Sequence, residues 1–164
     1  MKTLYLIGAT MGVGKTTVCQ TLKKRLDKSV FLDGDWCWDA DPFQVTEETK
    51  KMVMDNICYL LNNFLRCDAY ENVIFCWVMH EQAIIDSIIG RLDIKAHRVI
   101  SVSLTADEKS LRDRLSTDIK NGIRKTDVIE RSLARIPMYE LLETIKVDTT
   151  GKTVSEIADE IGKL

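Results

Sequence analysis

The feature that most constrains this chain is a glycine-rich segment near its N-terminus, GATMGVGKTT, at residues 8–17. It follows a short apolar run typical of a strand, Leu4–Ile7, and it opens a stretch, 18–26, in which apolar residues recur every four positions as in a helix. Its core, from Ala9 to Thr16, fits the Walker A pattern with Ala in the first position. The chain is therefore expected to place a tight, glycine-rich loop between its first strand and its first helix.

The residue types in this loop suit phosphate binding. Glycines let backbone N–H groups turn inward around a phosphate, and the N-terminus of the following helix adds partial positive charge. Lys15 is expected to reach the β- and γ-phosphates, and the hydroxyl of Thr16 to bind Mg²⁺. The alternative is a tight strand-to-helix turn with an incidental lysine. We predict that the loop binds a nucleoside triphosphate with Mg²⁺ through Gly12, Val13, Gly14, Lys15, Thr16 and Thr17.

Short apolar runs alternate with helical patterns from one end of the chain to the other. This alternation predicts a parallel sheet covered by helices on both faces. The expected strands are Leu4–Ile7, Val30–Leu32, Val73–Val78, Val99–Leu104 and Ile145–Val147.

Local signals suggest where some helices begin and end. Thr105 and Thr153 are each followed three residues later by a glutamate, which predicts a capping box at two helix starts. Pro137 lies inside an otherwise helical stretch, 127–142. Because proline lacks a backbone N–H, it is expected to kink or end that helix.

Composition narrows the functional classes. A length of 164 residues predicts one domain, and a net charge of −2 gives no electrostatic signature for nucleic-acid or membrane-surface binding. The chain has neither a membrane-spanning apolar stretch nor a signal-peptide pattern, so we expect a cytoplasmic protein, a monomer or a homodimer. The five cysteines are widely spaced, without C-x-x-C, which predicts reduced thiols.

A second motif, Phe31-Leu32-Asp33-Gly34-Asp35, ends the second expected strand. Its carboxylates project from the carboxyl edge of the sheet, where the phosphate loop also lies and where open α/β sheets bind ligands. Two such acids can have different roles: one helps to hold Mg²⁺, and the other accepts a proton or hydrogen bond from an attacking hydroxyl. The alternative is an Asp-Gly turn with two solvated acids.

With these motifs in this order, the sequence resembles small P-loop kinases of the nucleoside-monophosphate-kinase-like fold, in the style of shikimate, gluconate, adenylylsulfate and chloramphenicol kinases. The phosphate loop, the LDGD string, LRDRL at 111–115 and KVDTTGK at 146–152 cover nearly the whole chain. The resemblance implies one P-loop kinase domain over 1–164, with ATP as phosphoryl donor. It also implies a three-layer α/β/α P-loop NTPase fold, whose five-stranded parallel sheet has the order 2-3-1-4-5, with a short lid.

The resemblance assigns roles to single residues. Asp33 matches the metal-linked acid and Asp35 the acid at the substrate hydroxyl, although the two roles are interchangeable on the sequence alone. Arg114 matches an arginine that packs against the adenine, and Thr150 lies in the loop 148–152 that borders the base on its other side. Lys15 and Thr16 keep the roles given above.

The lid is expected over the polar stretch 116–126. In this family the lid brings arginines onto the transferring phosphate, where positive charge stabilises the transition state. The usual lid arginine is missing, because Asp118 stands at its position. Arg124 and Arg131 are the candidate catalytic replacements, together with Arg135, one helical turn beyond Arg131. The alternative for each of these arginines is an exposed surface charge.

The acceptor is expected to bind against the segment 36–68 and the end of the third strand. Trp36 and Trp38 follow the acidic pair and are candidates to stack on a flat or apolar substrate, or else to anchor the core. His80 is a candidate hydrogen-bonding group or helix cap, and Arg135 is a further candidate acceptor residue. No arginine follows the third strand where monophosphate kinases grip an acceptor phosphate, which favours a neutral or weakly charged hydroxyl compound.

These observations predict an ATP-dependent kinase that transfers the γ-phosphoryl group to a hydroxyl of a small molecule, with ATP and Mg²⁺ as cofactors. The alternatives are a nucleotide or nucleoside kinase and an ATP-binding regulatory module without transfer activity. A polynucleotide end kinase is disfavoured by the acidic charge balance.

Overall fold

The computed structural model describes every residue from 1 to 164. Its centre is a five-stranded sheet in the order β2-β3-β1-β4-β5, and all four neighbouring pairs are parallel. The fold class and strand order that the sequence predicted are therefore confirmed. The strands are β1 (Thr3–Gly8), β2 (Ser29–Asp33), β3 (Asn72–Trp77), β4 (Arg98–Thr105) and β5 (Ile145–Asp148).

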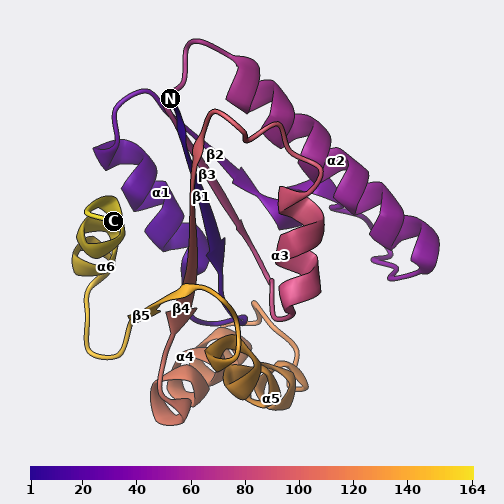
Figure 1. Cartoon of the computed structure of the whole chain (residues 1–164). Coiled ribbons are helices and arrows are strands. Elements are labelled where there is room, and N and C mark those ends of the chain that lie inside the picture. The colour runs from indigo at the N-terminus through magenta and orange to yellow at the C-terminus, as the bar shows by residue number, and fades with distance from the viewer.

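Helices cover both faces of this sheet (Figure 1). One hydrophobic cluster joins the sheet to α1, α4 and α6, and the other joins it to α2 and α3. In β1, Leu4 and Leu6 belong to the second cluster while Tyr5 and Ile7 belong to the first, because successive side chains of a strand point to opposite faces. The helices are α1 (Lys15–Arg25), the short 3₁₀ turn η1 (Gly34–Cys37), α2 (Glu47–Arg66), α3 (Gln82–Ile89), α4 (Glu108–Lys120), α5 (Val128–Glu140) and α6 (Val154–Gly162).

One of the two predicted capping boxes is present. At the start of α6, the backbone N–H of Glu156 donates to Thr153 Oγ1 at 3.2 Å, and Glu156 Oε2 accepts from the backbone N–H of Thr153 at 2.8 Å. The prediction for Thr105 is wrong, because β4 continues through Thr105 to pair with β5. Helix α4 is instead capped by Asp107, whose Oδ1 accepts from the backbone N–H of Ser110 at 2.6 Å.

Two boundary predictions in the C-terminal half also change. Helix α5 does not end at Pro137, which was one of the two outcomes expected there, but runs on to Glu140 with buried residues on both sides of the proline. The first part of the stretch expected as a lid, 116–120, belongs to α4, and only 121–127 forms a non-helical connection to α5.

The five cysteines are all free thiols. None of the helices combines the length and the apolar character that crossing a membrane requires.

Candidate active site

The phosphate loop joins β1 to α1 at the carboxyl edge of the sheet. Gly12 and Gly14 have φ angles of 86° and 89°, in the left-handed region that side chains disfavour. A Cβ on Gly14 would meet nothing within 4 Å, so only the backbone conformation requires a glycine there. Lys15, the first residue of α1, is 7% exposed. The loop therefore has the tight backbone turns that its glycines predicted, and the structure adds that its lysine is buried.

Helix α4 packs directly on this loop. A Cβ on Gly12 would lie 2.6 Å from Leu115 Cδ2, so a side chain at Gly12 would displace the helix. Arg114 Nη1 donates to the carbonyl of Val13 at 3.2 Å and to Thr149 Oγ1 at 3.4 Å. Arg114 thus links the phosphate loop to the loop 148–152, the segment that the family resemblance expects on the other side of the base from Arg114.

A buried carboxylate connects the loop to the acidic motif. Thr16 Oγ1 donates to Asp33 Oδ2 at 2.7 Å, and the backbone N–H of Asp35 donates to Asp33 Oδ1 at 3.0 Å. Asp33 is 3% exposed, whereas Asp35 lies at the surface. The hydroxyl and carboxylate oxygens of Thr16 and Asp33 form a donor set of the kind that Mg²⁺ prefers, so the residues fit that ion.

The carboxylate of Asp35 has one protein partner that sequence reasoning missed. Trp77, the last residue of β3, donates from its indole Nε1 to Asp35 Oδ1 at 3.2 Å. The signal in the sequence was a tryptophan at the carboxyl end of a strand expected beside the acidic motif. The same edge therefore holds the loop, both acids and this indole.

The two other tryptophans have different environments. Trp36 is 55% exposed and packs edge-on against Phe31, with ring centroids 5.2 Å apart. Trp38 packs against the core and makes edge contacts with Phe43 and Trp77, at 4.9 and 5.9 Å between ring centroids. Trp38 thus serves as a core anchor, while Trp36 presents most of its ring to solvent.

The candidate arginines are held in unequal ways. Arg124 Nε donates to Asp118 Oδ2 at 3.0 Å, and both side chains are half-buried. Arg131 lies 3.5 Å from Asp127 in an exposed ion pair. Arg135 forms no ion pair with any carboxylate of the protein, although its charge acts on His80 and Tyr139. The aspartate that replaces the usual lid arginine therefore holds the guanidinium of Arg124.

His80 lies past the end of β3 without capping a helix. The N-cap of α3 is Glu81, so the alternative that His80 is a cap is wrong. His80 Nε2 is 3.4 Å from Glu81 Oε1, and its Nδ1 is buried with no hydrogen-bond partner. Burial and the charge of Arg135 lower the pKa of His80, which keeps the imidazole neutral at pH 7. Buried oxygens of Tyr139 and Ser132 also lack partners.

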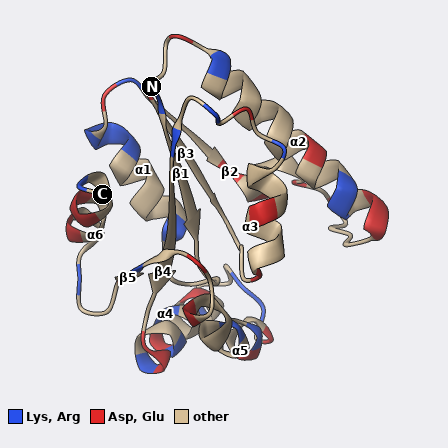
Figure 2. Cartoon of the chain, viewed as in Figure 1, with Lys and Arg blue, Asp and Glu red and all other residues tan.

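Charge is distributed unevenly around the site. Residues 29–49, which include the acidic motif and the loop to α2, contain no lysine, arginine or histidine. The amino end of α2 carries acidic side chains (Figure 2), of which Glu47 pairs with Lys50 at 2.9 Å. Farther along α2, Asp55 pairs with both Lys51 and Arg91. Residues 29–49 therefore bring no basic side chain to the acidic motif, and Lys50, Lys51 and Arg91 are each paired with a carboxylate.

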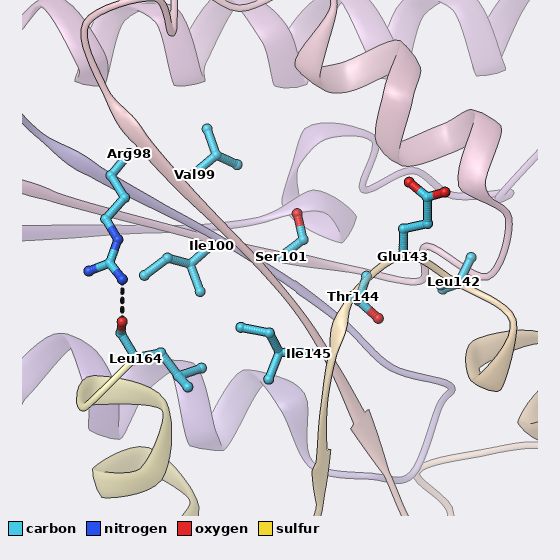
Figure 3. A pocket seen from close by; sticks show the side chains of 9 residues that line it. All are labelled: Arg98, Val99, Ile100, Ser101, Leu142, Glu143, Thr144, Ile145 and Leu164. Carbon is cyan, nitrogen blue, oxygen red and sulfur yellow. Dashed lines mark hydrogen bonds between the residues drawn. The ribbon is translucent and has the colours of Figure 1, made fainter.

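A separate hollow lies elsewhere on the sheet (Figure 3). It has a volume of about 540 Å³ and is lined by the first residues of β4, by 142–145 and by Leu164, whose carbonyl oxygen accepts from Arg98. The β4 residues of this lining, 98–101, lie in the amino half of that strand, whereas the phosphate loop follows the carboxyl end of β1. The hollow is therefore not part of the candidate site.

The fold and this edge define a P-loop nucleotide-binding protein. A protein-family model described as an AAA domain matches residues 6–136, and the chain belongs to this family. It is 27% identical to the shikimate kinase of Bacillus cytotoxicus, over 98% of this chain and 96% of the relative. It is 26% identical to a protein of Thermococcus gammatolerans provisionally named an adenylate kinase, over 98% of this chain and 84% of the relative.

Solved structures show the same fold. The tunicamycin resistance protein of Deinococcus radiodurans superposes with a TM-score of 0.73 at 20% identity, over 99% of this chain and 95% of that one. A gluconokinase from Sinorhizobium meliloti 1021 superposes with a TM-score of 0.69 at 17% identity, over 98% and 90% of the two chains. The predicted resemblance to small P-loop kinases is confirmed.

Proposed function

We propose that the protein is a kinase that transfers the γ-phosphoryl group of ATP to a hydroxyl group of a small molecule. The observation that supports this most directly is the hydrogen bond between Thr16 and Asp33, because it joins the helix that follows the phosphate loop to the acidic motif. The kinases among similar proteins support phosphoryl transfer in general.

Each residue then has a chemical task. Lys15 and the loop amides bind the phosphates, and Thr16 with Asp33 would hold Mg²⁺, which supplies charge neutralisation on the phosphates. Asp35 is exposed and accepts the proton of the attacking hydroxyl. Arg124 and Arg131 stabilise the negative charge of the transition state. The free Nη groups of Arg124 are available for this task, because Asp118 binds only its Nε.

The acceptor is a neutral or cationic hydroxyl compound with an apolar face. Supporting this, Trp36 lies next to Asp35 with 55% of its surface exposed, and residues 29–49 contain no basic residue. A dianionic acceptor would need several cations there, since each phosphate or carboxylate requires a paired guanidinium or ammonium when desolvated. His80 and Arg135 are the candidate contacts for polar groups of the acceptor.

The test begins with ATP binding. Lys15→Ala is expected to abolish calorimetric binding of ATP–Mg²⁺ while the far-UV circular dichroism stays unchanged. Lys109→Ala, on the exposed side of α4, is the matched control and keeps wild-type affinity. Equal affinity of the Lys15→Ala variant and the wild type would show that the loop does not bind the triphosphate.

Transfer is then tested with a panel of polyols, aminocyclitols, aromatic alcohols, sugars and nucleosides, with ADP release as the signal. Asp35→Asn should lower acceptor-stimulated release by about 100-fold or more, the scale of a lost general base. Stimulation that survives this change removes Asp35 from the mechanism. ATP binding without stimulation by any acceptor favours a regulatory module.

A nucleotide kinase is the second candidate, supported by the relative provisionally named an adenylate kinase. Nucleoside monophosphates in the same panel decide between the two. Preferential phosphorylation of a monophosphate over every alcohol would overturn the neutral-acceptor proposal. The monomeric or homodimeric state, the cytoplasmic location, the lack of nucleic-acid partners and the roles of Arg114 and Thr150 at the adenine stay predictions.

A further inference from the structure

We propose that Trp77 is a positioning residue for Asp35, because its indole N–H holds one carboxylate oxygen and leaves the other available to the acceptor hydroxyl. The inference rests on the proposed function, since it takes Asp35 as the group that receives the hydroxyl proton. It concerns a residue that belongs to none of the sequence motifs and that does not itself touch the reacting atoms.

The strand register brings these two residues together. β2 and β3 pair in parallel, with Asp33 opposite Cys76 in the last step of the ladder. Trp77 is the next residue of β3 and therefore lies beside the turn that begins at Gly34. Its Nε1 donates to Asp35 Oδ1 at 3.2 Å, and Asp35 Oδ2 has no protein partner. The carboxylate is thus held by one oxygen only.

Gly34 shows how closely the turn lies on the indole. A Cβ built on Gly34 would lie 2.5 Å from Trp77 Cγ and 2.6 Å from Trp77 Cδ1. Gly34 has no positive φ angle, so backbone conformation does not demand a glycine at this position. The indole itself demands it, since any larger residue would push the ring away. The glycine of the acidic motif therefore permits the contact that orients Asp35.

The indole is supported on a second side and has a suitable chemistry. Trp38 packs against it at an angle of 73° between the ring planes. An indole N–H donates but never accepts, and it does not titrate, so it remains a donor to the carboxylate at every working pH. Asp35 is otherwise exposed, and a single fixed donor reduces the orientations its carboxylate samples. Small errors in the placement of a general base cost large factors in rate.

The first test replaces only the donor atom. Benzothienylalanine, in which sulfur takes the place of the indole N–H, is introduced at Trp77 by suppression of a stop codon. The same analogue at Tyr59, exposed on α2, is the control. We expect kcat to fall about tenfold, equivalent to about 1.4 kcal/mol, with the KM for ATP unchanged because the phosphate loop is untouched. If the ring of Trp77 served only to fill space, the benzothienylalanine variant would keep the wild-type kcat. That result would overturn the inference.

A second variant reaches the same contact by ordinary mutagenesis. Gly34→Ala displaces the indole without altering Asp35 or Trp77, and it should lower kcat in the same direction while ATP affinity measured by calorimetry is retained. Unchanged kcat in Gly34→Ala would contradict the close packing on which the inference depends.

Nuclear magnetic resonance tests the hydrogen bond without any turnover. Asp35→Ala should move the indole ¹H–¹⁵N signal of Trp77, assigned through Trp77→Phe, and leave the signal of Trp36 in place. A Trp77 signal that does not respond overturns the contact itself. If the wild type transfers phosphate to no acceptor, the proposed function and the positioning role of Trp77 fall together. An active wild type with an equally active analogue refutes only the role of Trp77.

Discussion

Substituting the two left-handed glycines of the phosphate loop should have unequal consequences. Gly12→Ala and Gly14→Ala each force a side chain into the left-handed region, at φ angles of 86° and 89°. Gly14 has open space around its Cβ position, whereas a Cβ on Gly12 would lie 2.6 Å from Leu115 Cδ2 and 3.1 Å from Leu111 Cδ1. Gly14→Ala therefore measures backbone strain alone, and Gly12→Ala measures strain together with overpacking.

The magnitudes follow from these two contributions. An alanine in the left-handed conformation costs about 1–2 kcal/mol, and overpacking of a filled core adds about 1–3 kcal/mol. We expect Gly14→Ala to lower the free energy of unfolding by about 1–2 kcal/mol and Gly12→Ala by about 2–5 kcal/mol. The loss of flexibility in the unfolded chain is the same for both and cancels in the comparison.

Urea unfolding without nucleotide, followed by tryptophan fluorescence, measures both values, and a double-mutant cycle isolates the steric part. In a Leu115→Ala background the clash at Gly12 is largely removed, so Gly12→Ala and Gly14→Ala should then cost nearly the same. Equal costs in the wild-type background would refute the close packing of α4 on the loop. An excess cost of Gly12→Ala that persists without the leucine would assign it to another neighbour.

Three further outcomes are expected. Burial and the charge of Arg135 lower the pKa of His80 in the folded protein, so the unfolded chain binds the proton first as the pH drops. The free energy of unfolding should therefore fall as the pH drops below about 6.5. Urea unfolding measured at several pH values should show a smaller change with pH for His80→Gln than for the wild type. Asp107→Ala removes the cap of α4 and should cost about 1 kcal/mol in the same assay. Asp118→Asn weakens the hold on Arg124, so kcat should fall by less than it does in Arg124→Ala; an equal or larger loss would show that Asp118 acts by another route.

Most of the fold could be predicted from patterns that are local in the sequence. Each of the five strands was expected within one residue of its observed bounds, because buried parallel strands are short apolar runs between helical patterns. Helix boundaries were less certain where tertiary contacts compete with local signals. Thr105 has the spacing of a capping box, yet pairing with β5 keeps it in β4. Pro137 has no backbone N–H to donate to the helix, yet α5 continues past it.

The candidate site likewise has a part that could be predicted from local sequence and a part that could not. The phosphate loop and the acidic motif are contiguous strings, and the residue types alone indicate phosphate and metal chemistry. The contacts of Trp77, Arg124 and His80 join residues distant in sequence or depend on a buried environment, and no spacing rule predicts them. Whether an arginine is paired, or an imidazole is neutral, depends on which neighbours the fold supplies.

The sequence by itself determined that a phosphate loop opens a parallel α/β domain and that two acids follow its second strand, since these properties depend on residue types and short-range spacing. Only the tertiary structure decided that Asp33 bridges the loop and the acidic turn, that Asp118 holds Arg124, and that an indole from β3 holds Asp35. The physical reason is that strand register and helix packing set the distances between side chains far apart in the chain, and a hydrogen bond requires its donor and acceptor atoms to lie within about 3.5 Å of each other.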